Sequence, residues 1–483
     1  MGTSAGQDLR EQLFRRKPAE MLLAEAGAHE GGLKRVLGAL DLTALGIGAI
    51  IGAGIFVLTG VAAARYAGPA ISLSFVVAGF ACAMAALCYA EFAAMIPIAG
   101  SAYSYSYATM GELVGWIIGW DLVLEYAVGA AAVAVGWSGY LDVILRGMGI
   151  HLPSALTHAP EAGALLQMDL PALLIVLLIT AILYVGISES ARINSVIVAI
   201  KLAAVGVVIV VGVFYVKPAN WSPFAPLGWP GIMKGAAVIF FAYIGFDAVS
   251  TAAEEVVNPN RDLPIGILAS LFICTALYII VAAVLTGMVP AHLIDIRAPL
   301  ASAFVLRGMN FVAGIVSIGA VAGLTSVLLV LLLGQSRVFF AVSRDGLLPP
   351  MFSRIHPRFR TPYIPTTITG IVVGLTAALL PIQEIAELTN IGTLFAFVLV
   401  CIGIWILRRV EPDMRRPFRT PLVPLVPLLG IIFCGYLMLS LPGVTWLRFV
   451  VWMAAGLVIY FTYGRFHSRV AIANGDASRL SVD

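Results

Sequence analysis

Long apolar stretches recur along almost the whole chain, and they restrict its fold more than any motif does. Twelve of them are near or above the roughly 20 residues that a helix needs to cross a bilayer. Of the 483 residues, 60% are hydrophobic and 11% are charged, and the mean hydropathy is +0.99. The sequence predicts an all-α polytopic membrane protein. The spans are expected at about 40–66, 68–96, 111–145, 169–187, 191–216, 231–256, 264–289, 310–341, 363–380, 385–408, 421–441 and 444–464.

The distribution of basic residues predicts the orientation in the membrane. Cytoplasmic loops carry an excess of Lys and Arg. With the N-terminus in the cytoplasm, the cytoplasmic segments and adjoining span ends hold 21 basic residues and the opposite side holds 7. The bias predicts a multi-pass protein of the plasma (cytoplasmic) membrane with both termini inside, which requires an even number of spans. Topology accounts for the net charge of +3, so nucleic acid is not an expected partner.

Both ends of the chain are expected to be cytoplasmic segments. Residues 1–39 are polar and charged and lack the apolar core of a signal peptide. The stretch from Leu22 to Ala26 is either part of an amphipathic helix on the membrane surface or part of a solvated tail. Residues 465–483 form the second segment. Asp41, at the start of the first span, is expected to be a helix N-cap.

No metal or nucleophile motif stands out. The five cysteines, an odd number, are scattered over different apolar spans, which argues against a disulfide framework or a metal site. Membrane-embedded enzymes place His, paired carboxylates or a Ser–base pair at depth, whereas the six histidines here fall in loops or near the ends. The chain is therefore predicted not to be an enzyme and to use no metal or cofactor.

The first span contains a run of glycines, from Gly46 through Gly48 and Gly52 to Gly54. Each glycine in a helix costs about 1 kcal/mol relative to alanine. One interpretation is a seam of small residues against another helix. The other is a broken helix, which a membrane protein tolerates only where the backbone is buried in protein or lines a wet cavity. Bare N–H and C=O groups at such a break suit a small zwitterion.

A second interrupted span indicates an inverted repeat. The segment Ile239–Glu255 has Gly245 at its middle, flanked by aromatic residues, about five spans after the first break. Five is an odd number, so the second unit is inserted upside down relative to the first. Matching breaks in inverted halves point to a transporter's binding site. The predicted units are 40–216 and 231–408, with two further helices at 421–464.

Six sequence motifs along the chain look familiar. They are Gly-Ala-Ile-Ile-Gly-Ala-Gly-Ile-Phe (48–56), Tyr-Ala-Glu-Phe (89–92), Gly-Ser-Ala-Tyr-Ser-Tyr (100–105), Gly-Trp-Asp-Leu-Val-Leu-Glu-Tyr (119–126), Phe-Phe-Ala-Tyr-Ile-Gly-Phe-Asp (240–247) and Glu-Glu-Val-x-Asn-Pro-x-Arg-Asp-x-Pro-x-Gly (254–266). The first four resemble the amino acid–polyamine–organocation superfamily, and the last two narrow the likeness to a bacterial homologue of its cationic amino acid transporter family. The likeness covers about residues 13–465. It implies a LeuT-like fold of twelve helices, with a five-plus-five inverted repeat and broken first and sixth helices, that imports amino acids with protons.

A backbone site for the amino acid follows. The N–H groups near Ala53 and Gly54, at a half-helix N-terminus, would bind the carboxylate. Alanine at position 53 stands where many relatives carry serine or threonine, so a hydroxyl contact is missing. The resemblance also implies that Phe241 covers the site; an ordinary packing aromatic is the alternative. The carbonyls that would accept from the ammonium are, by resemblance, those of Ile50, Phe241, Ala242 and Ile244.

Lys201 is the only lysine near the middle of a span. An unpaired charge there costs about 3 kcal/mol or more, so the amine must be paired, hydrogen-bonded or neutral for part of the time. In proton-coupled relatives, a lysine in the fifth span takes the place of sodium and contacts the first break. We expect Lys201 to carry the coupling proton. A permanently charged tether to helix carbonyls is the alternative.

Buried carboxylates and one leucine concern specificity. Glu125 and Asp247 either meet a cationic substrate side chain or act in gating or proton transfer. Asp121 shares a helix face with Glu125. By resemblance, Leu331 lies at a position that limits the side-chain pocket, where a branched residue shortens it. The expected substrates are small or medium neutral L-amino acids such as alanine, with arginine and lysine poorer.

Other functions stay open. Obligate exchange and sodium coupling are the alternatives among carriers, and an amino acid sensor or a channel represents a different class. Sodium would need hydroxyl and carbonyl ligands where Lys201 projects. Membrane lipid surrounds any such chain, and the sequence leaves open whether a small accessory membrane subunit accompanies it.

Overall fold

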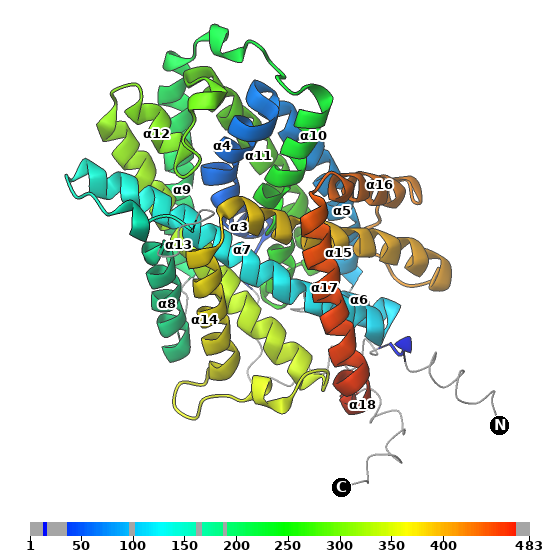
Figure 1. The fold of residues 1–483 in the computed structure, drawn as a ribbon. Helices are drawn as coiled ribbons and strands as arrows, with labels where there is room; N and C mark the ends of the chain where they lie inside the picture. Colours follow the sequence, from blue (N-terminus) through cyan, green and yellow to red (C-terminus); the bar gives the residue numbers. More distant parts are fainter. Residues whose placement is uncertain (1–12, 17–35, 96–101, 161–166, 187–190, 470–483) are drawn as a thin grey trace, which may run out of the picture.

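The computed structural model describes residues 13–16, 36–95, 102–160, 167–186 and 191–469, and these residues are mainly helical (Figure 1). Part of the 100–105 motif and the predicted surface helix around Leu22 lie outside the described residues. The longer elements, in chain order, are α3 (Ala39–Ile50), η1 (Gly54–Leu58), α5 (Ile71–Met95), α6 (Ala102–Met110), α7 (Glu112–Gly147), α8 (Leu170–Val185), α9 (Ala191–Gly212), α10 (Gly228–Ile239), η7 (Phe240–Tyr243), η8 (Asp247–Glu255), α11 (Pro259–Met288), α12 (Pro299–Val305), α13 (Asn310–Arg344), α14 (Tyr363–Leu379), α15 (Ile382–Val410), α16 (Leu425–Leu439) and α17 (Gly443–Ile459).

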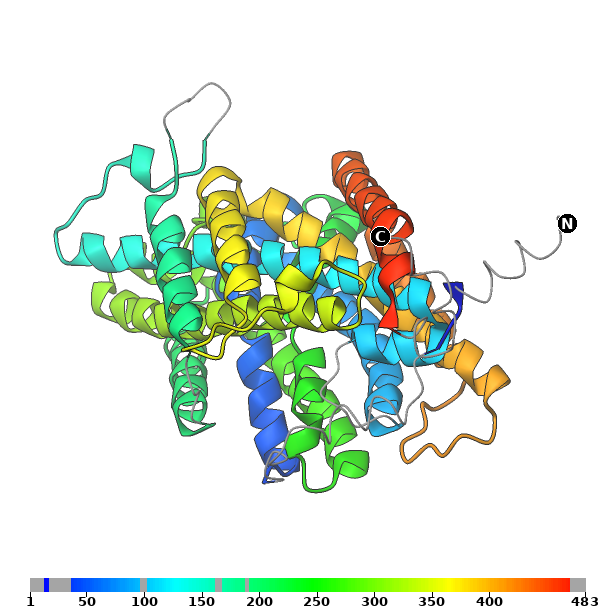
Figure 2. The same cartoon turned by 90° about the horizontal axis from the view of Figure 1, so that it is seen from below.

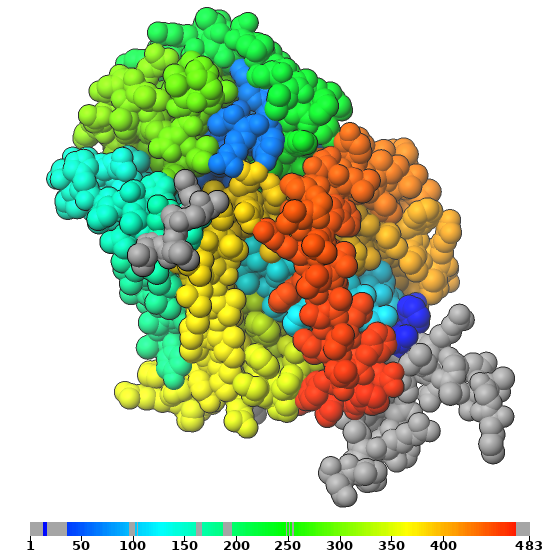
Figure 3. All heavy atoms as spheres, in the orientation of Figure 1, coloured from blue at the N-terminus to red at the C-terminus, as the bar shows by residue number. Residues whose placement is uncertain are grey.

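Length and apolar composition suit many of these helices to a membrane. Among the described residues, seven helical segments are long and apolar enough to cross one, and α3, α8, α14 and α16 are shorter apolar helices. Every range predicted as an apolar span is largely helical. Exposed apolar side chains include Leu375 on α14 and Val451 on α17. Figure 3 shows the segments that contain α14 and α17 on the face turned to the viewer. Lipid is the medium that such an exterior suits.

Two long helices run through the molecule and bring distant parts of the chain together. α7 packs against α13, α15 and α14. Figure 2 shows α7 and α13 crossing the molecule in similar directions. α11 packs against both α3 and α5, so the two interrupted segments lie among α5, α7, α11 and α15.

The first helix begins earlier than the sequence suggested, so the prediction that Asp41 caps it is wrong. Gly38 is the N-cap of α3, and Asp41 is its third residue. The Asp41 carboxylate accepts a hydrogen bond from the Gly38 N–H at 2.9 Å. Asp41 therefore still satisfies a free N–H at the helix start, as an acidic residue at the third position does in a capping box.

A buried ion cluster ties the end of α5 to the segment after α15. Glu91 is fully buried and accepts two hydrogen bonds from Arg408, at 2.9 and 2.8 Å. The Arg416 side chain lies 3.3 Å from it, and the Thr420 N–H donates to it at 2.8 Å. A carboxylate can be buried this deeply because several donors share its charge. Glu91 thus braces the end of α5 against α15 and the segment that follows it.

Candidate functional site

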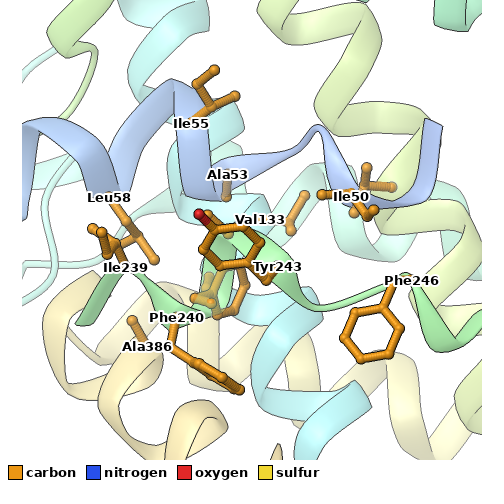
Figure 4. Packing of buried hydrophobic residues seen from close by; sticks show 14 of the residues in the cluster. Ile50, Ala53, Ile55, Leu58, Val133, Ile239, Phe240, Tyr243, Phe246 and Ala386 are labelled. Carbon is orange, nitrogen blue, oxygen red and sulfur yellow. The ribbon is translucent and has the colours of Figure 1, made fainter. Parts of the chain in front are cut away.

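The first predicted span is a broken helix. α3 ends at Ile50, and Ile51 is extended, with φ −73° and ψ 99°. A second helical piece begins at Gly54 with a π-helical turn. Figure 4 shows the unwound connection between Ile50 and Ala53. The glycines also pack closely, since a Cβ on Gly48 would lie 2.5 Å from Val198, so the small-residue contacts and the break occur together.

The second interrupted segment loosens in the same way. α10 gives way at Phe240 to the short 3-10 turn η7, and η8 follows after Ile244–Phe246. Gly245 has φ +114°, a conformation that only glycine adopts readily. The Asp247 carboxylate accepts a hydrogen bond from the Gly245 N–H at 3.2 Å. Part of the role of Asp247 is therefore to hold the backbone of this break.

The two breaks are in direct backbone contact. A Cβ on Gly54 would lie 2.1 Å from Cα of Ala242, and one on Gly245 would lie 2.9 Å from the carbonyl oxygen of Ala49. Only residues without a side chain allow this approach. The structure thus gathers the predicted backbone groups in one place, from Ile50, Ala53 and Gly54 on one break and from Phe241, Ala242 and Ile244 on the other.

The last carbonyls of α3 each meet a different neighbour. The final four C=O groups of a helix have no partner within it. That of Ile47 accepts from Ile51 N–H at 2.9 Å, and that of Ala49 lies against Gly245. Lys201 Nζ donates to the Gly48 oxygen at 2.7 Å, and the Tyr278 hydroxyl lies 2.8 Å from the Ile50 oxygen. The helix end is therefore held from three other segments.

Lys201 reaches the break from α9 while fully buried. Its aliphatic stem passes α13 at Gly323, where a Cβ would lie 2.8 Å from Lys201 Cγ. The amine bonds to the Gly48 carbonyl at the C-terminal end of α3, which is where a helix dipole favours a positive charge. The structure places Lys201 against the first break, as the resemblance implied.

Tyr278 joins the two breaks and was not among the residues predicted for the site. Its hydroxyl lies 2.8 Å from the Ile50 oxygen and 2.9 Å from the Ala242 oxygen. These are two of the carbonyls expected to accept from the substrate ammonium, and each keeps a second lone pair. A signal was available, because Tyr278 is the only tyrosine in the apolar span 264–289. A buried hydroxyl there needs a partner.

For a transporter of the kind that the resemblance implies, removing this hydroxyl is expected to slow transport. Tyr278→Phe keeps the ring, which packs among Phe75 and Tyr243, and leaves the two carbonyls without their shared donor. A buried hydrogen bond of this kind contributes about 1 to 1.5 kcal/mol, so the initial uptake rate should fall about tenfold. Uptake by reconstituted Tyr278→Phe, compared with wild type at equal protein density, measures this. An unchanged rate would mean that the bridge has no part in the transport cycle.

Two of the acidic residues considered above, Asp121 and Glu125, lie on α7 and not on either break. Glu125 is buried beside Thr393 of α15, whose hydroxyl donates to the Thr389 carbonyl at 3.2 Å. Asp121, one turn earlier, is fully buried beside Gly392, and within the described part of the chain neither of its carboxylate oxygens has a hydrogen-bond partner. The hydrogen bond of Lys201 goes to the Gly48 backbone carbonyl and not to one of these carboxylates. No group of three or more His, Cys, Asp or Glu in the described residues is arranged to hold a metal ion.

Leu331 and Phe241 come together at one end of the site. Both lie close to Gly129 of α7, where a Cβ would be 3.7 Å from Leu331 and 4.0 Å from Phe241. Phe241 is 7% exposed. The structure therefore places these two predicted residues against the same wall.

A separate cavity lies away from the two breaks. It has a volume of about 370 Å³ and is surrounded by α7, α8 and the connection between them. Its lining is almost entirely apolar and includes no residue of either break, so it suits hydrocarbon better than a zwitterion. The lining residues are Trp137, Leu141, Leu152, Leu156, Leu170, Pro171, Leu174, Ile175 and Leu178.

Comparison with known proteins identifies the family of the chain. A family model described as amino acid permease matches residues 37–463. The chain is 52% identical over 465 residues to the branched-chain amino acid permease BcaP of Bacillus subtilis, covering 96% of this chain and 100% of that protein. It is 51% identical over 456 residues to the methylthioribose transporter of the same bacterium, covering 94% and 98%. Cationic amino acid transporter 4 of Mus musculus is 33% identical over 589 aligned positions, covering 95% and 91%.

Proposed function

Because the chain belongs to the amino acid permease family of the amino acid–polyamine–organocation superfamily, we propose that it is a proton-coupled carrier that imports neutral L-amino acids by alternating access. Membership in this family makes it a membrane transport protein and not an enzyme. The proposal concerns the coupling ion, the substrate class and the residues that act on each.

One observation carries the coupling proposal, which is the hydrogen bond from Lys201 Nζ to the Gly48 carbonyl at 2.7 Å. A charged amine at this buried position is stabilised by the end of α3, and loss of its proton removes that stabilisation. The inner half of the first broken helix would then be held less firmly. Gain and loss of a proton at Lys201 would in this way bias the conformation of the helix that binds substrate.

Main-chain groups would recognise the substrate backbone. The carboxylate would meet the N–H groups of Ala53 and Gly54 at the start of the outer half-helix. The ammonium would meet carbonyls of Ile50, Phe241, Ala242 and Ile244. Ala53 has no hydroxyl, so recognition would depend on the backbone alone at this position. Glu125 and Asp247 would act in gating or proton transfer.

The architecture proposed for this carrier has twelve membrane crossings. Residues 40–216 and 231–408 would form two inverted five-helix units, and 421–464 the last two helices. The excess of basic residues on one side supports cytoplasmic termini for residues 1–39 and 465–483 in a bacterial plasma membrane. Alternating access would move the broken helices relative to the remaining ones.

The names of two relatives point to two different substrate classes. One is named for branched-chain amino acids and another for methylthioribose, at nearly equal identity. The apolar neighbours Leu331 and Phe241 support a neutral side chain over that of arginine or lysine. A sugar such as methylthioribose has neither a carboxylate nor an ammonium for the two breaks, which favours an amino acid.

Counterflow into proteoliposomes tests the substrate and the carrier mechanism together. Vesicles are preloaded in sodium-free buffer with alanine, valine, leucine, arginine, lysine or methylthioribose, and entry of external labelled alanine is followed. We expect saturable stimulation by internal alanine, valine and leucine, and little by the cations or by methylthioribose. Entry of labelled alanine that internal amino acid does not stimulate and that does not saturate would indicate a channel. Binding of alanine without any entry would indicate a sensor. Stimulation by methylthioribose alone would contradict the amino acid proposal.

Truncating Leu331 is expected to lengthen the accepted side chain. Leu331→Ser removes most of an apolar side chain at the wall shared with Phe241. Differences of one methylene in such pockets change specificity by about 10- to 200-fold. Uptake of methionine or phenylalanine relative to alanine should therefore rise about tenfold. If the relative uptake of these amino acids is unchanged, Leu331 does not border the substrate side chain.

A further inference from the structure

Gly129 differs from the other buried glycines of α7 in what surrounds it. A Cβ on Gly115, Gly119, Gly136 or Gly139 would lie 2.6 to 2.9 Å from a neighbouring atom, so packing alone explains those glycines. A Cβ on Gly129 would lie at 3.7 Å from Leu331 Cδ1, 3.7 Å from Thr389 Cγ2 and 4.0 Å from Phe241 Cε2. These are ordinary contact distances. Close packing therefore does not explain the missing side chain at position 129.

The three neighbours come from three different elements and all present carbon atoms. Leu331 is on α13, Phe241 is in η7 and Thr389 is on α15. The Thr389 hydroxyl donates to the Ile385 carbonyl at 3.0 Å within its own helix. Its methyl group is the part that lies near Gly129. The space between these residues is thus bordered by a leucine methyl, a threonine methyl and an aromatic edge.

The acidic residue Glu125 lies one helical turn away on α7. Glu125 precedes Gly129 by four residues, and Thr393, which lies beside Glu125, follows Thr389 by four. One turn of helix is about 5.4 Å. A substrate side chain that ended beside Gly129 would therefore contact only carbon atoms. A longer cationic side chain would have to extend past the carbon atoms of Leu331, Thr389 and Phe241 to approach Glu125.

We propose that Gly129, together with the Thr389 methyl group, sets the size of the substrate side chain and admits branched aliphatic ones. This inference rests on the proposed function, because it assigns the space beside Phe241 and Leu331 to the substrate. The missing Cβ of Gly129 leaves room for the second branch of valine, leucine or isoleucine. The ligand class is neutral L-amino acids with three- or four-carbon branched side chains.

Two substitutions with opposite expected effects test this assignment. Gly129→Ala adds one methyl group to the space without overlap, so the protein should remain folded. The kcat/KM for valine and leucine relative to alanine should fall about tenfold or more. Thr389→Ser removes the methyl group and keeps the hydroxyl that bonds to Ile385. It should raise kcat/KM for methionine or phenylalanine relative to leucine about tenfold.

Gly314→Ala on α13 is the matched control, because an added Cβ there meets nothing within 4 Å. It should leave all ratios within twofold of wild type. If wild type transports none of these amino acids, the proposed function fails and this inference fails with it. If wild type transports them but neither Gly129→Ala nor Thr389→Ser changes the ratios, only this inference is overturned. Should Gly129→Ala not fold, the result with Thr389→Ser decides.

Discussion

Gly54→Ala is expected to abolish amino acid uptake. The added Cβ would lie 2.1 Å from Cα and 2.3 Å from Cβ of Ala242. These atoms belong to a backbone segment held by the Tyr278 hydroxyl and cannot rotate away like the end of a flexible side chain. Overpacking of this kind costs about 3 kcal/mol, which corresponds to a loss of about a hundredfold in a rate or an equilibrium.

The measurement is the initial rate of alanine uptake, together with the melting temperature of the purified protein. Gly206→Ala on α9 is the control, since its Cβ would meet nothing within 4 Å, and it should transport like wild type. Uptake by Gly54→Ala within twofold of wild type would show that the two breaks do not need direct backbone contact during the transport cycle.

Lys201→Gln is expected to remove proton-driven accumulation while leaving exchange intact. Glutamine keeps an N–H donor for the Gly48 carbonyl but cannot carry a proton on or off. A pH difference of about one unit supplies about 1.4 kcal/mol per proton and supports about tenfold accumulation at one proton per substrate. Wild type should approach that ratio with an acidic exterior, and the variant should stop near a ratio of about one.

Comparing Lys201→Ala with Lys201→Gln distinguishes the role of Lys201 as proton carrier from its role as a hydrogen-bonded tether to Gly48. Lys201→Ala removes both the charge and the hydrogen bond to Gly48, so exchange should fall further than with Lys201→Gln. Labelled alanine accumulation and counterflow on the same vesicles report the two functions. If Lys201→Gln still accumulates alanine from an imposed proton gradient, the lysine is a structural tether and another group carries the proton.

Apolar length and glycine position were enough to predict much of the fold. The predicted ranges coincide with helices, because a bilayer requires long runs of apolar residues and leaves few other solutions. The breaks near Gly52 and at Gly245 were predicted because glycine destabilises the interior of a helix. The short helices α6 and α12 were not predicted, because each is too short for a periodic pattern to stand out.

The candidate site was predictable where it depends on the backbone and less so where it depends on packing. Lys201 could be singled out, since a single buried charge in a span needs a partner. The bridge made by Tyr278 could not be predicted. A single tyrosine in an apolar span signals a buried hydroxyl that needs a partner, but which carbonyls it meets depends on which helix packs beside the two breaks. The same is true of Gly129, whose difference from the other glycines of α7 lies entirely in neighbours from three distant segments.

The most direct test of proton-coupled import follows protons rather than substrate. Wild-type protein is reconstituted in sodium-free vesicles containing a pH-sensitive dye, with equal pH on both sides and a potassium ionophore to prevent charge accumulation. Addition of external alanine should acidify the vesicle interior at a rate that saturates with alanine, and Lys201→Gln should not respond. Entry of labelled alanine into the same vesicles with no change in internal pH would contradict proton symport and place the protein among exchangers or uniporters.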